Sequence, residues 1–151
     1  MDGIVIRPCA PADLDAIGAV HDAARRVELR LAELEKAFLP LSVAAQREGL
    51  FDYMIDVALY EGRVAGFAAY TSRELAWLYV LPALHRRGIG EALVRHAIAR
   101  VPSLCEAEVL RGNLPARRLY EKCGFSLTET VSGVMPGNED FPVTVWRMAR
   151  G

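Results

Sequence analysis

The sequence lacks most features that would place it among membrane, secreted or metal-binding proteins. Its longest apolar run, residues 75–84, is interrupted by Pro82 and is too short to cross a bilayer. The first residues show no basic segment followed by an apolar stretch, so we expect no secretory signal. Cys9, Cys105 and Cys123 have neither CxxC spacing nor a metal-type spacing with histidine. These absences predict a cytoplasmic protein with reduced thiols, no metal and no membrane partner.

An excess of charge of one sign is also missing. The formal net charge is −1, with 52% hydrophobic and 25% charged residues, as in ordinary soluble domains. Without an overall basic field, we do not expect the chain to bind nucleic acid. No internal repeat, low-complexity segment or linker divides the 151 residues, so we predict a single domain over residues 1–151.

The hydrophobic pattern alternates between strand-like and helix-like segments. It predicts helices that begin near residue 11 and continue through 24–38, then at 42–49 with Ser42 as cap, at 91–101 and at 113–123. Strands are predicted at 4–6, 54–60, 63–70, 74–80, 104–110, 125–132 and 142–149. This order predicts an α/β (α+β) domain with a mixed, mostly antiparallel sheet of about seven strands and helices on both faces.

Two of these segments carry more detailed expectations. The strand at 74–80 is apolar throughout, which is typical of a central strand buried on both faces. It flanks the helix at 91–101 together with the strand at 104–110, so these two strands should be parallel neighbours. Residues 132–142 contain Gly133, Pro136, Gly137 and Pro142, which predicts a loop; this loop could cover an acceptor pocket.

The most informative segment is the short stretch between the strand at 74–80 and the following helix. Residues 85–90 read His-Arg-Arg-Gly-Ile-Gly. N–H groups at a helix N-terminus have no intrahelical partner and attract anions. Gly88 and Gly90 let a pyrophosphate approach the backbone, while Arg86 and Arg87 add positive charge. This arrangement predicts a phosphate-binding loop, although the two arginines could also be ordinary surface cations.

The common nucleotide motifs are absent, since the chain has neither GxxxxGK[ST] nor GxGxxG. Instead, residues 80–90, Val-Leu-Pro-Ala-Leu-His-Arg-Arg-Gly-Ile-Gly, resemble the R/Q-x-x-G-x-G/A motif of the GNAT superfamily of N-acetyltransferases, with His85 at the first position. Residues 113–125 resemble that family's N-x-x-A-x-x-x-Y-x-x-x-G-F segment, and residues 4–13 weakly resemble its opening. The resemblance covers nearly the whole chain in order.

This resemblance implies acetyl-CoA as co-substrate and a cofactor site whose two central parallel strands splay apart. The pantetheine arm would then pair with the strand edge at Leu78 and Val80, and the Val80 N–H would polarise the thioester carbonyl. The cofactor-binding residues that it implies are Leu78, Tyr79, Val80, His85, Arg86, Arg87, Gly88, Ile89, Gly90, Glu91, Asn113, Ala116 and Tyr120.

Two residues are implied to be catalytic. Tyr120 matches the position that protonates the departing CoA thiolate, and Glu74 lies where some members place a general base. Each also has a structural interpretation: Tyr120 as a core aromatic and Glu74 as a solvated strand residue. Asn113 could cap a helix, contact the pantetheine, or both. Arg111, Arg117 and Arg118 could bind the 3′-phosphate of CoA or simply be solvated. Glu129, Glu139 and Asp140 could recognise a cationic acceptor or belong to a solvated surface loop.

The leading hypothesis is therefore an acetyl-CoA-dependent N-acetyltransferase. It would act on a primary amine of a small molecule or peptide by direct attack in a ternary complex. Two alternatives stay open: a non-catalytic acyl-CoA-binding or regulatory module on the same fold, and transfer of a longer acyl group such as succinyl. Because many members of the family are homodimers, the resemblance also raises the prospect of a homodimer.

Overall fold

The computed structural model describes residues 3–151 and is built around one seven-stranded sheet. The strand order is β1-β2-β3-β4-β5-β7-β6, and only the β4–β5 pair is parallel. The predicted mixed, mostly antiparallel sheet is thus confirmed; residues 1 and 2 of the predicted domain lie outside the described residues. The strands are β1 (Ile4–Pro8), β2 (Met54–Tyr60), β3 (Arg63–Tyr70), β4 (Glu74–Val80), β5 (Glu106–Leu110), β6 (Ser126–Met135) and β7 (Asn138–Ala149).

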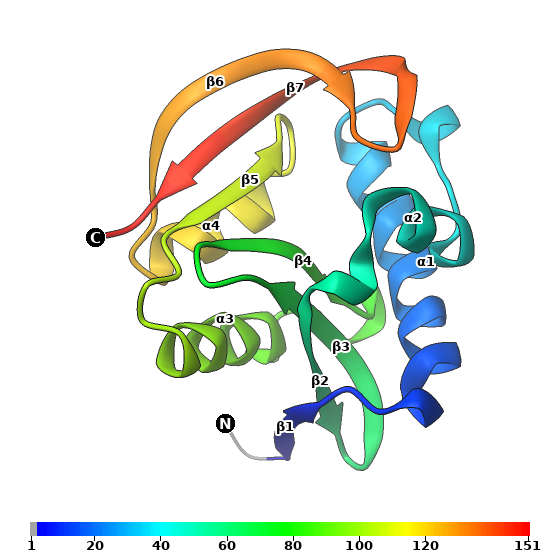
Figure 1. Ribbon diagram of the computed structural model, residues 1–151, viewed down its shortest axis with the longest axis vertical. Helices are drawn as coiled ribbons and strands as arrows, with labels where there is room; N and C mark the ends of the chain where they lie inside the picture. The colour runs from blue at the N-terminus through cyan, green and yellow to red at the C-terminus, as the bar shows by residue number, and fades with distance from the viewer. Residues whose placement is uncertain (1–2) are drawn as a thin grey trace.

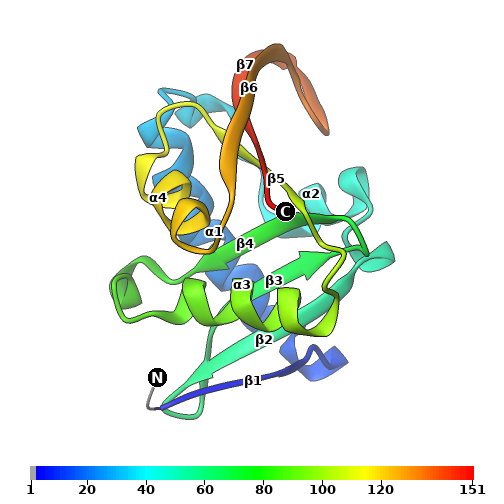
Figure 2. The same ribbon diagram turned by 90° about the vertical axis from the view of Figure 1, so that its left-hand side faces the viewer.

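The helices cover both faces of the sheet, as Figure 1 shows. They are α1 (Leu14–Leu31), α2 (Leu41–Glu48), α3 (Ile89–Arg100) and α4 (Leu114–Lys122). On one face, α1 and α2 bury Ile17, Val20 and Ala44 against Phe67 and Trp77 of the sheet. On the other face, α3 and α4 bury a second apolar cluster (Ile89, Leu93, Val94, Ala97 and Tyr120 with Tyr70 and Leu75), and α3 crosses β2, β3 and β4 (Figure 2).

The first long helix is shorter than predicted. It ends at Leu31, because Glu33 adopts a left-handed conformation with φ of 59°. The Leu34 N–H then bonds to the Leu29 carbonyl and the Glu33 N–H to the Arg30 carbonyl, which is a Schellman ending. Glycine normally marks such an ending, so the sequence gives no warning of it here.

The helix predicted from a Ser42 cap also starts differently. It is α2, and Ser42 lies within it and is exposed. Its first N–H group, on Leu41, donates instead to the carboxylate of Asp22 in α1 at 2.9 Å. A side chain nineteen positions earlier in the chain therefore satisfies this helix end.

The prediction of a loop at 132–142 is wrong, because β6 and β7 form one long hairpin around a two-residue turn at Pro136 and Gly137. Gly133 pairs with Val143, and Pro142 lies opposite Val134. Strand β5 pairs with β7 only from Val145 onward. Pro142 therefore needs no second ladder partner, and the strand tolerates it.

The strand at 74–80 is β4, but it is not buried on both faces along its whole length. Leu75 and Trp77 are buried, whereas Ala76 is exposed and residues 78–80 are only partly covered. The reason is that its neighbour β5 pairs with its first two residues alone, Glu74 with Glu106 and Leu75 with Ala107. Beyond them the two strands separate, and this separation forms the candidate site.

Candidate active site

An unpaired strand edge lies where β4 and β5 diverge. The Leu81 N–H donates to the Ala65 carbonyl of β3 at 2.8 Å. Because alternate residues of a strand direct their polar backbone groups to opposite sides, the N–H groups of Leu78 and Val80 point away from β3, toward the divergence. Such an edge can accept an extended ligand as an added strand.

His85, at the variant motif position, contacts this same edge. Its Nε2 donates to the Val80 carbonyl at 3.0 Å, which places the proton on Nε2, since a carbonyl only accepts. The imidazole therefore satisfies the Val80 carbonyl with a hydrogen bond, and the Val80 N–H still points toward the divergence. The structure thus gives the histidine a local backbone role.

The predicted phosphate loop follows directly and leads into α3. Arg86 and Gly88 adopt left-handed conformations with φ of 66° and 83°, and Gly88 is the N-cap residue of α3. These turns place successive N–H groups at the helix N-terminus, where they can surround an anion. Arg86 and Arg87 are exposed beside it, and Arg87 also contacts the hydroxyl of Tyr60 at 3.3 Å.

Glu91, in the first turn of α3, is turned toward other protein groups. Its carboxylate binds Arg95 at 2.8 Å and Lys122 of α4 at 3.0 Å. These cations lower its pKa, with the hydrogen bond from Arg95 contributing most. Glu91 thus links α3 to α4 beside the loop. Gly90 belongs to the same contact, since a Cβ there would lie 3.0 Å from the Leu119 side chain.

Helix α4 brings Tyr120 to the divergence. Its N-cap is Asn113, whose side-chain oxygen accepts the Ala116 N–H at 3.3 Å, so the predicted cap is present. Tyr120 is buried, and its ring packs edge-on against Phe125 with ring centres 5.4 Å apart. Burial, and next the charge of Glu28, raises the pKa of the Tyr120 phenol, which keeps it protonated at neutral pH.

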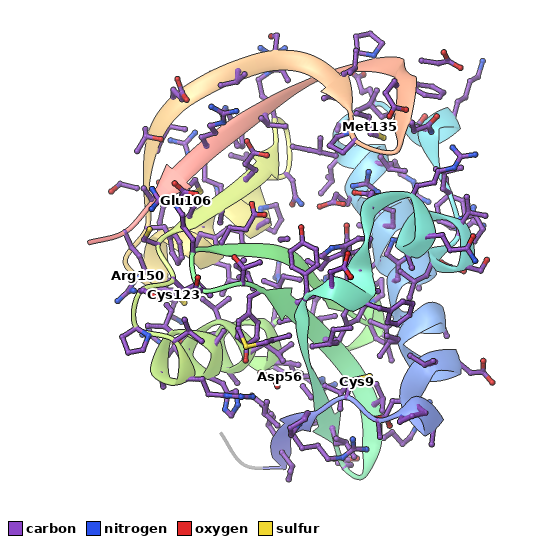
Figure 3. The ribbon with its side chains drawn as sticks, in the orientation of Figure 1. Cys9, Asp56, Glu106, Cys123, Met135 and Arg150 are labelled. Carbon is purple, nitrogen blue, oxygen red and sulfur yellow. The ribbon has the colours of Figure 1, made fainter. Side chains whose placement is uncertain are left out.

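A cavity of about 180 Å³ occupies the divergence between the two strands. Its lining comes from α1, α2, β4, β5, α4 and the β6–β7 hairpin, so it passes from one face of the sheet toward the other. Met135 of the hairpin, labelled in Figure 3, is one of its walls. The predicted site residues that the structure brings into this lining are Leu78, Tyr79, Asn113, Ala116 and Tyr120.

Other predicted residues lie outside the lining. Val80 and residues 85–91 follow it along the chain, toward the start of α3. Glu129, Glu139 and Asp140 are exposed on the hairpin. Arg111, after β5, and Arg118, in α4, are also exposed. Arg117 lies 3.5 Å from Glu121 and stacks over the Trp146 ring.

Glu74 lies at the closed end of the β4–β5 pair and is not part of the cavity lining. Burial raises the pKa of its carboxyl, and the charges of Glu108 and Glu106 add to that rise, while a hydrogen bond from Tyr53 acts in the opposite direction. A raised pKa suits a general base that works near neutral pH. Contact between Glu74 and a substrate in the cavity would require a bridging water.

Sequence reasoning missed the polar network on the α1 side of the cavity. Glu28 is its centre: its carboxylate accepts from Arg25 and, at 3.1 Å, from the Tyr79 hydroxyl. The Asn113 amide lies 3.4 Å from the other carboxylate oxygen. The only signal in the sequence was the i, i+3 spacing of Arg25 and Glu28, which is common on solvated helix surfaces.

Comparison with known proteins now identifies the class. The model of the Acetyltransferase (GNAT) family matches residues 22–125, more than half of the chain. The chain therefore belongs to the GNAT family, and the resemblance seen in the sequence is confirmed.

Individual relatives agree with this assignment. The chain is 37% identical over 70 residues to the peptidyl-lysine N-acetyltransferase YiaC of Escherichia coli K12; the match covers 46% of this chain and about half (47%) of the length of that curated relative. A GCN5-related N-acetyltransferase from Rhodopseudomonas palustris has the same fold, with a TM-score of 0.77, 20% identity and coverage of 100% of this chain and 97% of its own. The yncA protein of Salmonella typhimurium, solved with its cofactor acetyl-CoA, also has this fold, with a TM-score of 0.66, 19% identity and coverage of 99% of this chain and 95% of its own.

Two kinds of feature are absent from residues 3–151. In this part of the chain no helix is long and apolar enough to cross a membrane. The same residues contain no group of three or more histidine, cysteine, aspartate or glutamate side chains arranged to hold a metal ion.

Proposed function

We propose that this protein transfers an acetyl group from acetyl-CoA to a primary amine of a small molecule or peptide. The observation that supports this most is the joint placement of three features around one divergence: a strand edge with open N–H groups, a glycine-bearing helix N-terminus, and a buried phenol. Family membership and the acceptor named in YiaC, peptidyl-lysine, support the same reaction class.

The donor set fits coenzyme A. The pyrophosphate would bind the N–H groups of residues 86–90, where Arg86 and Arg87 supply positive charge. The pantetheine arm would pair with the edge at Leu78 and Val80 as an extra strand. When bound, acetyl-CoA supplies the activated thioester. Asn113 and Ala116, at the start of α4, border the cavity that the arm would enter.

In the proposed step the amine nitrogen attacks the thioester carbonyl carbon. The Val80 N–H donates to the oxygen on which negative charge develops. The C–N bond forms as the C–S bond breaks, the departing sulfur takes the phenolic proton of Tyr120, and solvent returns a proton to the phenolate. The proton lost by the amine passes through water to Glu74, whose pKa is raised by burial.

The direct test is release of CoA thiol from acetyl-CoA across a panel of primary amines. We expect release with at least one amine, at a rate that depends on the concentrations of both substrates without a covalent acetyl-enzyme. A folded protein that neither binds CoA nor releases thiol would contradict the proposal. CoA binding without turnover would favour the non-catalytic module instead, and faster release from succinyl-CoA would revise the acyl donor. Cytoplasmic location and homodimerisation stay predictions from the sequence.

A further inference from the structure

The cavity carries more negative than positive charge. Three carboxylates line it, on Glu28, Glu48 and Glu108, whereas Arg25 is the one arginine or lysine in the lining within the described residues. His21 also lines the cavity, but its Nδ1 is bonded to Asp22, and burial lowers its pKa, so it is neutral near pH 7. The lining therefore has more carboxylates than cations to pair with them.

Two of the three carboxylates already have close cationic partners. Glu28 forms an ion pair with Arg25. The other Nη group of Arg25 lies 3.5 Å from the Met135 sulfur. Glu108 is paired with Arg147 at 2.8 Å. Glu48 has no ion pair within residues 3–151, and its pKa is raised, by burial first, and then by the charges of Glu28 and Glu139, against the opposing effect of Arg25. A partly buried carboxylate in this position is stabilised by any cation that joins it.

Glu48 and Tyr120 line the cavity from helices that cover opposite faces of the sheet. Glu48 ends α2 against the hairpin turn: a Cβ on Gly137 would lie 3.0 Å from the Glu48 Cγ, and Arg47 bonds to the Gly137 carbonyl at 2.9 Å. Glu28 instead contacts Asn113, the cap of the helix that carries Tyr120. Besides burial, the charge of Glu28 raises the pKa of both Tyr120 and Glu48, so Glu28 lies close to both residues.

We infer that Glu48 determines acceptor specificity by binding a second positive charge on the acceptor, remote from the amine that reacts. This inference rests on the proposed function. The reacting amine must lose its own charge before it attacks, so the cation that stays in the complex is a different group. Arg25 is already neutralised by Glu28, so the cavity is poorly suited to an acceptor that carries a carboxylate there. The substrate class is an elongated amine with a cationic far end.

The experiment compares three acceptors that share one methylene chain and differ in the end group: 1,5-diaminopentane, n-hexylamine and 6-aminohexanoate. We expect kcat/KM for the diamine to exceed that for n-hexylamine by about tenfold or more, as for a charge-assisted hydrogen bond in a shielded site. The anionic 6-aminohexanoate should be the poorest of the three.

Variants of Glu48 assign the effect to this residue. Glu48→Gln should remove the preference for the diamine, and Glu48→Lys should reverse it toward 6-aminohexanoate, with CoA affinity changed less than twofold in both. The matched control is Glu139→Gln. It removes an equal charge from an exposed position on the β6–β7 hairpin, near Glu48 but outside the cavity lining, and should keep the preference for the diamine. A variant that still binds CoA normally is folded, so its specificity is interpretable.

Three results would overturn the inference while leaving the proposed function intact. The first is equal kcat/KM for the diamine and n-hexylamine in the active wild-type protein, and the second is an unchanged diamine preference in Glu48→Gln. The third is an equal loss of preference in Glu139→Gln, which would show that the preference comes from the overall negative charge of this region and not from a specific contact with Glu48. Absence of transfer to every amine, together with absence of CoA binding, would remove the proposed function and this inference with it.

Discussion

The two sides of the divergence between β4 and β5 are built in different ways. On the cofactor side, the groups that would bind the ligand are backbone N–H groups of Leu78 and Val80 and those at the start of α3. On the acceptor side, they are charged side chains from α1, α2 and β5, of which Glu28 and Glu48 are examples. The first side depends on local conformation, and the second on how distant elements pack.

This difference explains why one side can be recognised in a sequence and the other cannot. Backbone binding needs glycines and a helix start within a few residues, so it leaves a compact motif. Side chains that meet across a cavity need no fixed spacing. Members of one family can therefore share the cofactor side and differ in the acceptor. In this chain the cofactor side is visible as a sequence motif, and the acceptor side is not.

The largest expected effect comes from Gly88→Asp on the cofactor side. The new side chain adds negative charge where the pyrophosphate should bind, at a left-handed φ of 83°. We expect this change to abolish CoA binding, as measured by calorimetry.

The matched control for that change is Gly62→Asp. Gly62 has nearly the same φ, 80°, with no atom within 4 Å of its added Cβ, but lies in the β2–β3 turn, outside residues 85–90. It should impose similar backbone strain without affecting CoA binding. Equal loss of affinity in both variants, or normal affinity in Gly88→Asp, would contradict the phosphate-loop assignment.

The next largest effect is expected at Tyr120, where the two sides meet. Tyr120→Phe removes the proton donor but keeps the ring that packs on Phe125. We expect kcat to fall by ~10²–10⁴ while the Kd for CoA stays within about twofold. Steady-state kinetics combined with calorimetry separates these quantities. A loss in kcat of less than twofold would leave the phenol with a packing role only.

The smallest of the three effects is expected for Glu74→Gln. A general base acts in its unprotonated form, so wild-type kcat/KM should fall as pH decreases through the raised pKa of Glu74. The variant should lose about 10²-fold at neutral pH and should lack that acidic limb. Glu106→Gln is the control, since Glu106 lies opposite Glu74 in the register but binds Arg73 at 3.0 Å. It should keep the acidic limb and move it to lower pH, because the charge of Glu106 contributes to the raised pKa of Glu74. A pH profile unchanged by Glu74→Gln would show that another group, or water alone, takes the proton.

Much of the fold was predictable, because the periodicity of hydrophobic residues reports burial directly. Strand β2, strand β3 and their tight turn appear in the structure where the pattern placed them. The errors fall where tertiary contacts replace a local signal. Glu33 ends α1 without a glycine, Asp22 caps α2 from another helix, and Pro142 sits in a strand because β5 does not reach it.

The candidate site divides in the same way. Asn113 as a helix cap and the loop before α3 follow from local sequence, and the structure contains both features. The network around Glu28 does not follow from it, because Arg25, Tyr79 and Asn113 come from three separate elements. Periodicity alone cannot say which polar residue of an amphipathic helix points into a cavity rather than into solvent.

The central claim is that coenzyme A binds in the divergence, along the β4 edge and over the start of α3. Amide hydrogen exchange of the full chain, with and without CoA, tests it directly. We expect slower exchange on CoA binding at residues 86–90 and at the Leu78 and Val80 amides, with no change in β2. Binding of CoA without added protection at residues 86–90, or with protection confined to other elements, would contradict it.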